Sequence, residues 1–410
     1  MATRLSMRRM IGPGLLVAVG YVDPGNWATD IAAGSRYGYV LLGSVLLASL
    51  LGLLFQTMAA RLGMATGEDL ATLTRRLLPR PLVLSAWMAS ELAIVATALA
   101  ELIGGAIALR LLFGIPLEGG LVIAAVGTLA IMALSQKRRS AHEYVISGLL
   151  AIVSLSFVYL LIKAHPAGMD VLQGLASSAK VFGNHGMLAV ALGIVGATVM
   201  PHNLFLHSGL IADRSKSLLP QERPMALRVV ETDTRVSLLL ATLVNAAMLM
   251  VAAASLSHIG AAVSSLDDAY RTIALTLGTG AAVIFAVALY AAGQSSAITG
   301  VLAGSILSRG FRGRESRTWL RGIGTRLAGV GIGFALLTSG PGMSADAVLV
   351  LSQCVLGVAL PFALLPMMML ARKRDLMGQY AFGRSFLVLA SAATALIMLL
   401  DGYLLITAFN

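Results

Sequence analysis

Two short motifs, separated by five expected membrane crossings, hold the residues with which this sequence could do chemistry. The first is DPGN at positions 23–26, and the second is MPH at positions 200–202. Each places a proline inside a long apolar segment, so the carbonyl four residues earlier loses its helical donor. In lipid an unpaired carbonyl is costly, and such a break persists where it lines a cavity or holds a ligand. Both motifs are therefore candidate binding sites.

The groups around the two breaks form a plausible set of ligands for a cation. They are the Asp23 carboxylate, the Asn26 amide oxygen, the carbonyls of Gly20 and Ala197, which Pro24 and Pro201 release, and the Met200 thioether. An aspartate within a membrane is a functional-site hypothesis by default. Oxygen ligands suit magnesium, calcium and manganese, but a thioether contributes little to the first two. The mixed set predicts a divalent transition metal such as Mn(II) or Fe(II).

The composition indicates an all-α polytopic membrane protein. Of 410 residues, 58% are hydrophobic and only 12% are charged, whereas soluble domains have about 25% charged residues. The apolar residues form continuous blocks long enough to cross a ~30 Å hydrocarbon core as helices, which excludes the alternating strands of a β-barrel. We expect eleven crossings in one domain spanning 1–410. Their approximate ranges are 11–37, 39–61, 82–112, 118–135, 143–163, 187–212, 236–257, 271–307, 327–340, 346–371 and 385–408.

The net charge of +11 reflects topology rather than nucleic-acid binding. If the N-terminus is cytoplasmic, all but five of the 30 Lys and Arg residues fall on the inner side. The five are Arg36, Arg110, Lys163, Lys180 and Arg271. This positive-inside asymmetry predicts an inner N-terminus and an outer C-terminus, with the lipid bilayer as the partner. The single cysteine, Cys354, excludes a disulfide within the chain.

The positions of the two prolines predict an internal repeat. Pro24 and Pro201 lie at similar depths in their helices, and five crossings separate them. This is the pattern of inverted repeats, in which paired interrupted helices meet at the substrate site near the middle of the membrane. We expect a first repeat over 11–163, a second over 187–371 and an appended helix over 385–408.

Both motifs resemble those of the Nramp family of proton-coupled divalent metal transporters. Further similar stretches are ELAIVATALAELIG at 91–104, GQSSAITGVLAG at 293–304 and LVLSQCVLGVALPFALLP at 349–366. The resemblance implies a LeuT-like fold of eleven transmembrane helices, with helices 1 and 6 broken. It implies proton-driven import of Mn(II) or Fe(II) through the inner membrane of a bacterium. The metal would be the cargo, with no cofactor and no obligate protein partner.

The resemblance also implies a set of metal-binding residues. In the family, the residues that match Asp23, Asn26, Ala197 and Met200 bind the metal, and a glutamine matching Gln353 approaches it when the site closes. The thioether argues against the branches of the family that carry magnesium or aluminium.

This chain departs from the family at two positions. Ala98 stands where members commonly have an aspartate that belongs, with the acid matching Glu101, to the proposed proton exit route. Ala359 stands where a glutamine is frequent. The first departure puts tight proton coupling in question.

Proton transfer would involve several ionisable groups near the breaks. We expect Asp23 to be both ligand and proton acceptor, because its proton must leave when the cation binds. His202 and His207 are candidates through the near-neutral titration of histidine, although either could be a packing residue. An intramembrane Glu101 needs a partner, for which Arg326 is a candidate. That pair would serve either a proton path or a clamp between helices.

Four other functions compete with this interpretation. A carrier of amino acids or organic cations on the same architecture would have no use for a mid-membrane aspartate beside a thioether, and a magnesium carrier would have no use for the sulfur. A passive metal channel, or a uniporter with weak proton coupling, would fit the change at Ala98. A membrane metalloprotease or lipid hydrolase would need H-E-x-x-H or G-x-S-x-G, and neither motif occurs. We therefore expect no enzyme.

Overall fold

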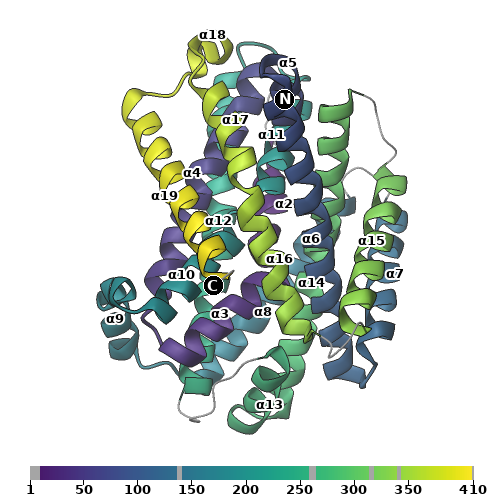
Figure 1. Ribbon diagram of the computed structural model, residues 1–410, viewed down its shortest axis with the longest axis vertical. Helices are drawn as coiled ribbons and strands as arrows, with labels where there is room; N and C mark the ends of the chain where they lie inside the picture. Colours follow the sequence, from purple (N-terminus) through teal and green to yellow (C-terminus); the bar gives the residue numbers. More distant parts are fainter. Residues whose placement is uncertain (1–9, 136–140, 258–264, 314–317, 339–342, 409–410) are drawn as a thin grey trace.

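All the regular structure in the described part of the chain is helical (Figure 1). The computed structural model describes residues 10–135, 141–257, 265–313, 318–338 and 343–408. The α-helices are α2 (Pro13–Gly20), α3 (Pro24–Tyr37), α4 (Leu42–Thr66), α5 (Leu70–Leu77), α6 (Arg80–Phe113), α7 (Leu117–Ser135), α8 (Ala141–Ala164), α9 (Gly168–Ala176), α10 (His185–Thr198), α11 (Pro201–Ser215), α12 (Arg223–Leu256), α13 (Leu266–Thr276), α14 (Thr279–Arg312), α15 (Thr318–Thr338), α16 (Ala345–Ala359), α17 (Pro361–Ala371), α18 (Arg374–Met377) and α19 (Arg384–Ala408). Two 3₁₀ helices, η1 (Ser178–Gly183) and η3 (Gly378–Tyr380), complete the list.

Ten helical segments in the described ranges are long and apolar enough to cross a membrane. Two of them, α10 with α11 and α16 with α17, consist of helices that follow each other closely. The remaining expected crossing, 11–37, is absent from these ten because it is divided into α2, of 8 residues, and α3, of 14. The chain is thus an all-helical membrane protein.

Three predicted boundaries were wrong. The block expected at 327–340 is α15, which includes residues from Thr318 onward because its arginines form ion pairs instead of ending the helix. The block expected at 271–307 splits at Gly278, whose φ of 98° suits glycine. Helix α13 precedes this residue and α14 follows it. Helix α12 begins at Arg223, well before the apolar run expected at 236–257.

Each proline motif begins a new helix instead of kinking an old one. Asp23 has extended backbone angles and caps α3, and its side chain accepts a hydrogen bond from the backbone N–H of Asn26. Pro24 and Pro201 are the first residues of α3 and α11, where a missing N–H costs nothing. Met200 is likewise extended, with φ −92° and ψ 129°. The predicted breaks are therefore present at both motifs.

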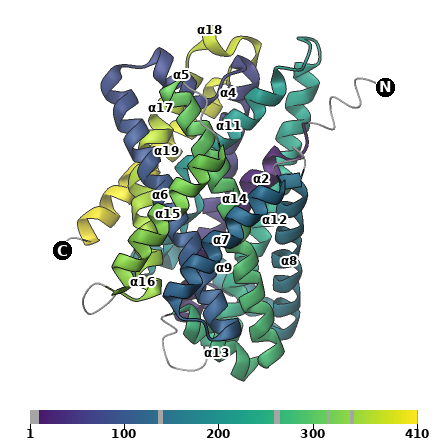
Figure 2. The same ribbon diagram turned by 90° about the vertical axis from the view of Figure 1, so that its right-hand side faces the viewer.

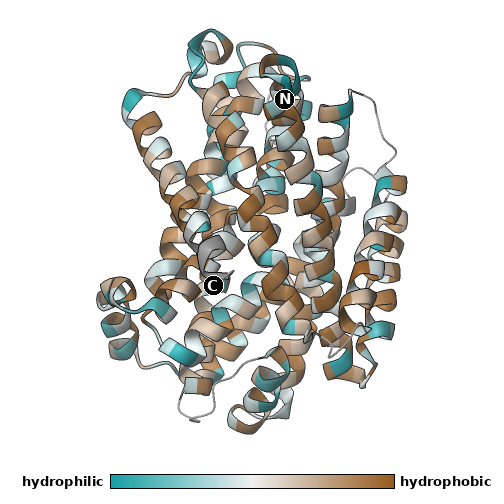
Figure 3. Ribbon diagram, viewed as in Figure 1, coloured by the Kyte–Doolittle hydropathy of each residue, from teal (hydrophilic) through white to brown (hydrophobic). Residues whose placement is uncertain are grey.

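The broken helices are enclosed by the long helices of the bundle. Helices α6 and α14 pack along each other, and α12 packs on α3 and α4 (Figures 1 and 2). Hydrophobic residues dominate the helices between the two ends of the molecule (Figure 3). Leu50, Leu155, Leu239 and Leu389 each leave more than half of their surface exposed. Such an exposed apolar surface suits lipid rather than water.

A glycine lets α6 reach the first break. A Cβ atom at Gly104 would lie 2.3 Å from the Cβ of Pro24. The pyrrolidine ring is rigid, so this approach requires the hydrogen side chain of glycine.

We therefore predict that Gly104→Ala destabilises the fold by about 1–3 kcal/mol, the usual cost of overpacking a core. The matched control is Gly148→Ala in α8, where a Cβ would meet nothing within 4 Å. That change should be neutral or stabilise the helix, by up to ~1 kcal/mol. Thermal unfolding of both variants in detergent measures the difference, and equal effects would contradict the packing described here.

Candidate metal-binding site

The two breaks lie against each other inside the bundle. The Thr198 hydroxyl, at the end of α10, donates to the Asn26 Oδ1 at 3.3 Å. On the other side of the break, the Asn203 side chain covers Gly20, where a Cβ would lie 2.1 Å from Asn203 Nδ2. The end of each first half-helix therefore contacts the first turn of the opposite second half-helix.

Asp23 has one satisfied and one free carboxylate oxygen. Its Oδ1 accepts from the backbone N–H and from the Nδ2 of Asn26, both at 2.9 Å. Its Oδ2 is buried and has no hydrogen-bond partner among the described residues. Asp23 and Asn26 are 0% and 1% exposed. A buried charge without a partner is costly, so the free Oδ2 is the strongest indication of a ligand in this part of the molecule.

Met200 lies at the second break beside a polar side chain that sequence reasoning missed. The thioether is fully buried and accepts a weak hydrogen bond from Asn203 Nδ2 at 3.8 Å. The Oδ1 of the same amide is buried and has no hydrogen-bond partner in the described part of the chain. Asn203 directly follows the MPH motif, and its place in the first turn of α11 is the signal that could have indicated it. It adds a hard oxygen close to the soft sulfur.

The carbonyls of the first break are largely satisfied by side chains. Asn245 Nδ2 donates to the carbonyl of Tyr21 at 2.8 Å, and Trp27 Nε1 donates to that of Val22 at 3.2 Å. Gly20 ends α2 and Ala197 lies in the last turn of α10, both buried. Since Pro24 and Pro201 have no N–H, neither can serve as the α-helical donor to these two carbonyls.

Gln353 already contacts the first break. Its side chain, on α16, packs on Gly25, where a Cβ would lie 1.7 Å from Gln353 Nε2. Its Oε1 is buried, and no described residue donates a hydrogen bond to it. The structure therefore brings the tenth expected crossing to the DPGN turn, with a free oxygen.

The two histidines of α11 occupy different environments. His202 Nδ1 lies 3.4 Å from the Thr97 hydroxyl on α6. His207 Nδ1 lies 3.0 Å from Gln56 Oε1, and Gln56 Nε2 donates to the Tyr21 hydroxyl at 3.1 Å. Both rings are buried. A chain of polar contacts thus runs from His207 to the turn between α2 and α3.

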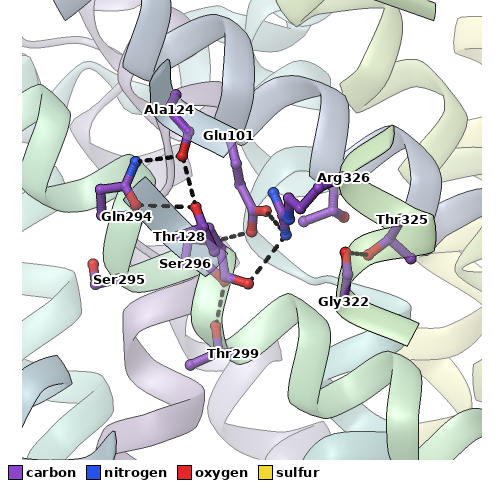
Figure 4. Close-up of polar contacts among 12 residues, drawn as sticks. Glu101, Ala124, Thr128, Gln294, Ser295, Ser296, Thr299, Gly322, Thr325 and Arg326 are labelled. Carbon is purple, nitrogen blue, oxygen red and sulfur yellow. Dashed lines mark hydrogen bonds and ion pairs between the residues drawn. The ribbon is translucent and has the colours of Figure 1, made fainter. Parts of the chain in front are cut away.

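Glu101 and Arg326 form a buried ion pair between α6 and α15, as expected (Figure 4). The Nη2 of Arg326 lies 2.8 Å from Glu101 Oε2 and also donates to the carbonyl of Ala297 at 3.1 Å. Ser296 donates to the other oxygen of Glu101 at 2.8 Å. Both carboxylate oxygens are therefore satisfied, in contrast to Asp23.

Helix α14 is also joined to α7, by hydrogen bonds between uncharged groups (Figure 4). Gln294 Nε2 donates to the carbonyl of Ala124 at 3.2 Å, and the Thr128 hydroxyl donates to Gln294 Oε1 at 3.0 Å. Both oxygen and nitrogen of the amide are used between helices. Gln294 is thus a structural residue in this arrangement.

Polar contacts hold the bundle together at both ends. Near the N-terminus, Asp233 of α12 accepts from the backbone N–H groups of Gly12 and Gly14, at 3.1 and 2.7 Å, and so caps α2. At the opposite end, Arg110 of α6 pairs with Asp267 of α13. Asp346 of α16 accepts from the backbone N–H of Leu266 at 2.9 Å. The candidate ligands Asp23, Asn26 and Met200 lie between these contacts and are buried.

The fold of this chain is also found in a distantly related solved structure. A solved structure of MhsT in complex with L-phenylalanine superposes with a TM-score of 0.62, covering 95% of this chain and 98% of that one. At 16% sequence identity this likeness concerns the fold alone. This chain thus shares its overall helical fold with MhsT.

Comparisons at higher identity give the family. A match to the family described as natural resistance-associated macrophage protein-like spans residues 14–407. A divalent metal cation transporter MntH of Brucella suis is 42% identical over 393 residues, which is 95% of this chain and 86% of that protein. The crystal structure of the Eremococcus coleocola manganese transporter has a TM-score of 0.87 and 32% identity, over 97% of this chain and 86% of that one. The chain belongs to the Nramp family.

The buried ion pair allows a stability test. Arg326→Met leaves the Glu101 carboxylate buried without its cation, and we expect a loss of about 3–5 kcal/mol. The double variant Glu101→Leu with Arg326→Met removes both charges and should recover most of that loss. Thermal unfolding in detergent compares the two, and an equal loss in the single and the double variant would contradict the pairing.

Proposed function

We propose that this chain is a secondary transporter that imports divalent transition metal ions, Mn(II) and also Fe(II), across the inner membrane of a bacterium. The observation that carries the proposal is the free Oδ2 of Asp23, a carboxylate oxygen buried at a helix break and left without a partner. Relatives of similar length are a divalent metal cation transporter and a manganese transporter. In this proposal the ion is bound by Asp23, Asn26, Met200 and the carbonyl of Ala197, with that of Gly20 nearby.

The expected preference for transition metals rests on Met200. Hard oxygens alone would hold Mg(II) or Ca(II) as well as Mn(II), whereas a thioether favours softer ions. Asn203 keeps the sulfur in place with a hydrogen bond and leaves its own oxygen free. Gln353, already against Gly25, is the proposed additional ligand of the closed state.

The proposed topology has eleven crossings, with the first made of α2 and α3 together. Residues 11–163 would form one repeat, 187–371 its inverted counterpart and 385–408 the appended helix. Two features support it: the matching breaks at Pro24 and Pro201, and the basic segments at the N-terminal end. Helices α5 and α18, with their arginines, lie at the same end of the molecule in Figures 1 and 2. In this proposal that end is the cytoplasmic one.

Transport would proceed by alternating access around the fixed site. Asp233 holds the inner end of α2, and the Arg110–Asp267 pair joins helices at the outer end. Releasing one set of contacts while keeping the other exposes the ion to one side at a time. In this proposal, the state with both sets of contacts formed is the closed state.

Proton coupling would arise at Asp23, since a carboxylate that binds a cation cannot keep its proton. The proposed proton relays are His202, which lies beside Thr97, and His207, which is linked to Tyr21 by hydrogen bonds. The Glu101–Arg326 pair would be the next step of the proton path. Ala98 stands where family members commonly have an acid of the proton exit route. On that ground, a metal uniporter with weak proton coupling is the second candidate function.

The remaining alternatives have less support. The alternative of an amino-acid carrier rests on the fold that this chain shares with MhsT, and at 16% identity that likeness does not extend to the ligand. A membrane enzyme is excluded because transporters match the chain over nearly its whole length. A magnesium carrier would leave the buried thioether of Met200 without a purpose.

Asp23→Ala should abolish Mn(II) uptake into proteoliposomes while the protein stays folded, because the ion loses its only anionic ligand. Asp375→Ala, at an exposed position of α18, is the control and should leave uptake unchanged. Undiminished Mn(II) uptake by the Asp23 variant would discard the site.

Met200→Ala should admit Mg(II) or Ca(II), because the remaining donors are hard oxygens. Uptake of Mn(II), Mg(II) and Ca(II) is compared in the same vesicles, with a pH-sensitive dye inside to follow protons. Met367→Ala, also fully buried but on α17, is the control. An unchanged order of ions would show that the sulfur does not set selectivity.

A further inference from the structure

A second buried carboxylate, Asp30, lies on the helix that Asp23 caps. The two residues are seven positions apart, with Asp23 at the cap of α3 and Asp30 in its interior. At ~1.5 Å per residue, seven positions place them about 10 Å apart along the helix axis. In the proposed topology α3 is the outer half of the first crossing. Asp30 therefore lies on the outer side of the metal site.

Asp30 has no evident structural partner. It is 1% exposed, and its Oδ2 accepts no hydrogen bond among the described residues. Within that part of the chain no Lys, Arg or His forms an ion pair with it. It does not cap a helix, since Asp23 caps α3. A carboxylate in a membrane helix is expensive, so a position without a structural use indicates a functional one.

The neighbours of Asp30 give it a surrounding of low polarity. One turn further out, Gly34 packs on the backbone of α12, where a Cβ would lie 2.4 Å from the carbonyl of Leu249. One turn further in, the Trp27 ring packs against Phe157 and Phe285, with centroids 4.8 and 5.3 Å away. Charges interact more strongly across such a medium than in water.

The other buried acids of the membrane region differ from Asp30. Glu101 has Arg326 and Ser296 as partners. Asp401 on α19 also has an unpartnered Oδ2, but it faces Gly357, where a Cβ would lie 3.2 Å from Asp401 Oδ1. Asp401 is thus on a different helix, whereas Asp30 lies on the helix that the principal ligand caps.

We propose that Asp30 is a second anionic group of the metal site, which balances the charge of a divalent ion bound at Asp23 and draws it in from the outer side. The inference rests on the function proposed above. A divalent ion beside one carboxylate carries an excess charge of +1, and Asp30 makes the set neutral. At about 10 Å and an effective dielectric constant of ~20 to 40, this attraction changes the dissociation constant by roughly ten- to a few hundredfold.

The test is calorimetric titration of the purified, full-length protein in detergent with MnCl₂ alone. Asp30→Asn keeps the shape and removes the charge, and it should weaken Mn(II) binding at least tenfold. Asp30→Ser is a second neutral variant in case the first fails to fold, and Asp30→Glu should restore most of the affinity. Asp401→Asn removes an equally unpaired buried carboxylate from α19 and should leave binding within about twofold of the unmodified protein. Thermal unfolding without metal confirms that each variant is folded.

The outcomes separate the two proposals. If the unmodified protein does not bind Mn(II), or if Asp23→Asn binds as well as it does, the proposed function itself fails. If binding requires Asp23 but both neutral Asp30 variants bind like the unmodified protein, only the role of Asp30 is overturned. An equal weakening by Asp401→Asn would overturn it too, because any lost charge would then have the same effect. Weakening confined to the neutral Asp30 variants supports it.

Discussion

The constraint behind this structure is that backbone polar groups inside a bilayer need partners. Prolines at two positions remove donors from long apolar segments, and the chain responds by ending one helix and starting another. At the first break, side chains from α12 and α3 supply the missing donors to the carbonyls of Tyr21 and Val22. Among the described residues, buried side-chain oxygens of Asp23, Asn203 and Gln353 have no hydrogen-bond partner. The breaks thus concentrate free oxygen donors in one buried place, where a cation can use them.

Two of the intramembrane acids, Glu101 and Asp23, show opposite solutions to the same cost. Glu101 is neutralised within the protein by Arg326 and held further by Ser296. Asp23 accepts two N–H groups of Asn26 on one oxygen, and its other oxygen has no hydrogen-bond partner among the described residues. A fully paired carboxylate is poorly suited to bind a passing ion, and an unpaired one is poorly suited to hold a fold together. We infer that the first serves mainly the bundle and the second serves the cargo.

Much of this arrangement could be predicted from sequence because proline and apolar run length act locally. The breaks at 23–26 and 200–202 follow from the missing N–H, and the partner of Glu101 follows from the cost of burying a lone charge. The early start of α15 could not be predicted, since the residues that pair with Arg321 and Arg326 are distant in sequence. Asn203 could not be predicted for the same reason, because its role depends on its contact with Gly20 on another helix.

The capping of α2 by Asp233 has a consequence for water. The N–H groups of Gly12 and Gly14 bond to a carboxylate that lies more than two hundred residues away in the sequence, not to solvent. When α2 separates from α12, these two donors and the carboxylate need new partners, and only hydration can provide them at once. In the proposed transport cycle, separation and wetting of that end would therefore occur together, and an ion leaving there would meet its hydration shell at the exit.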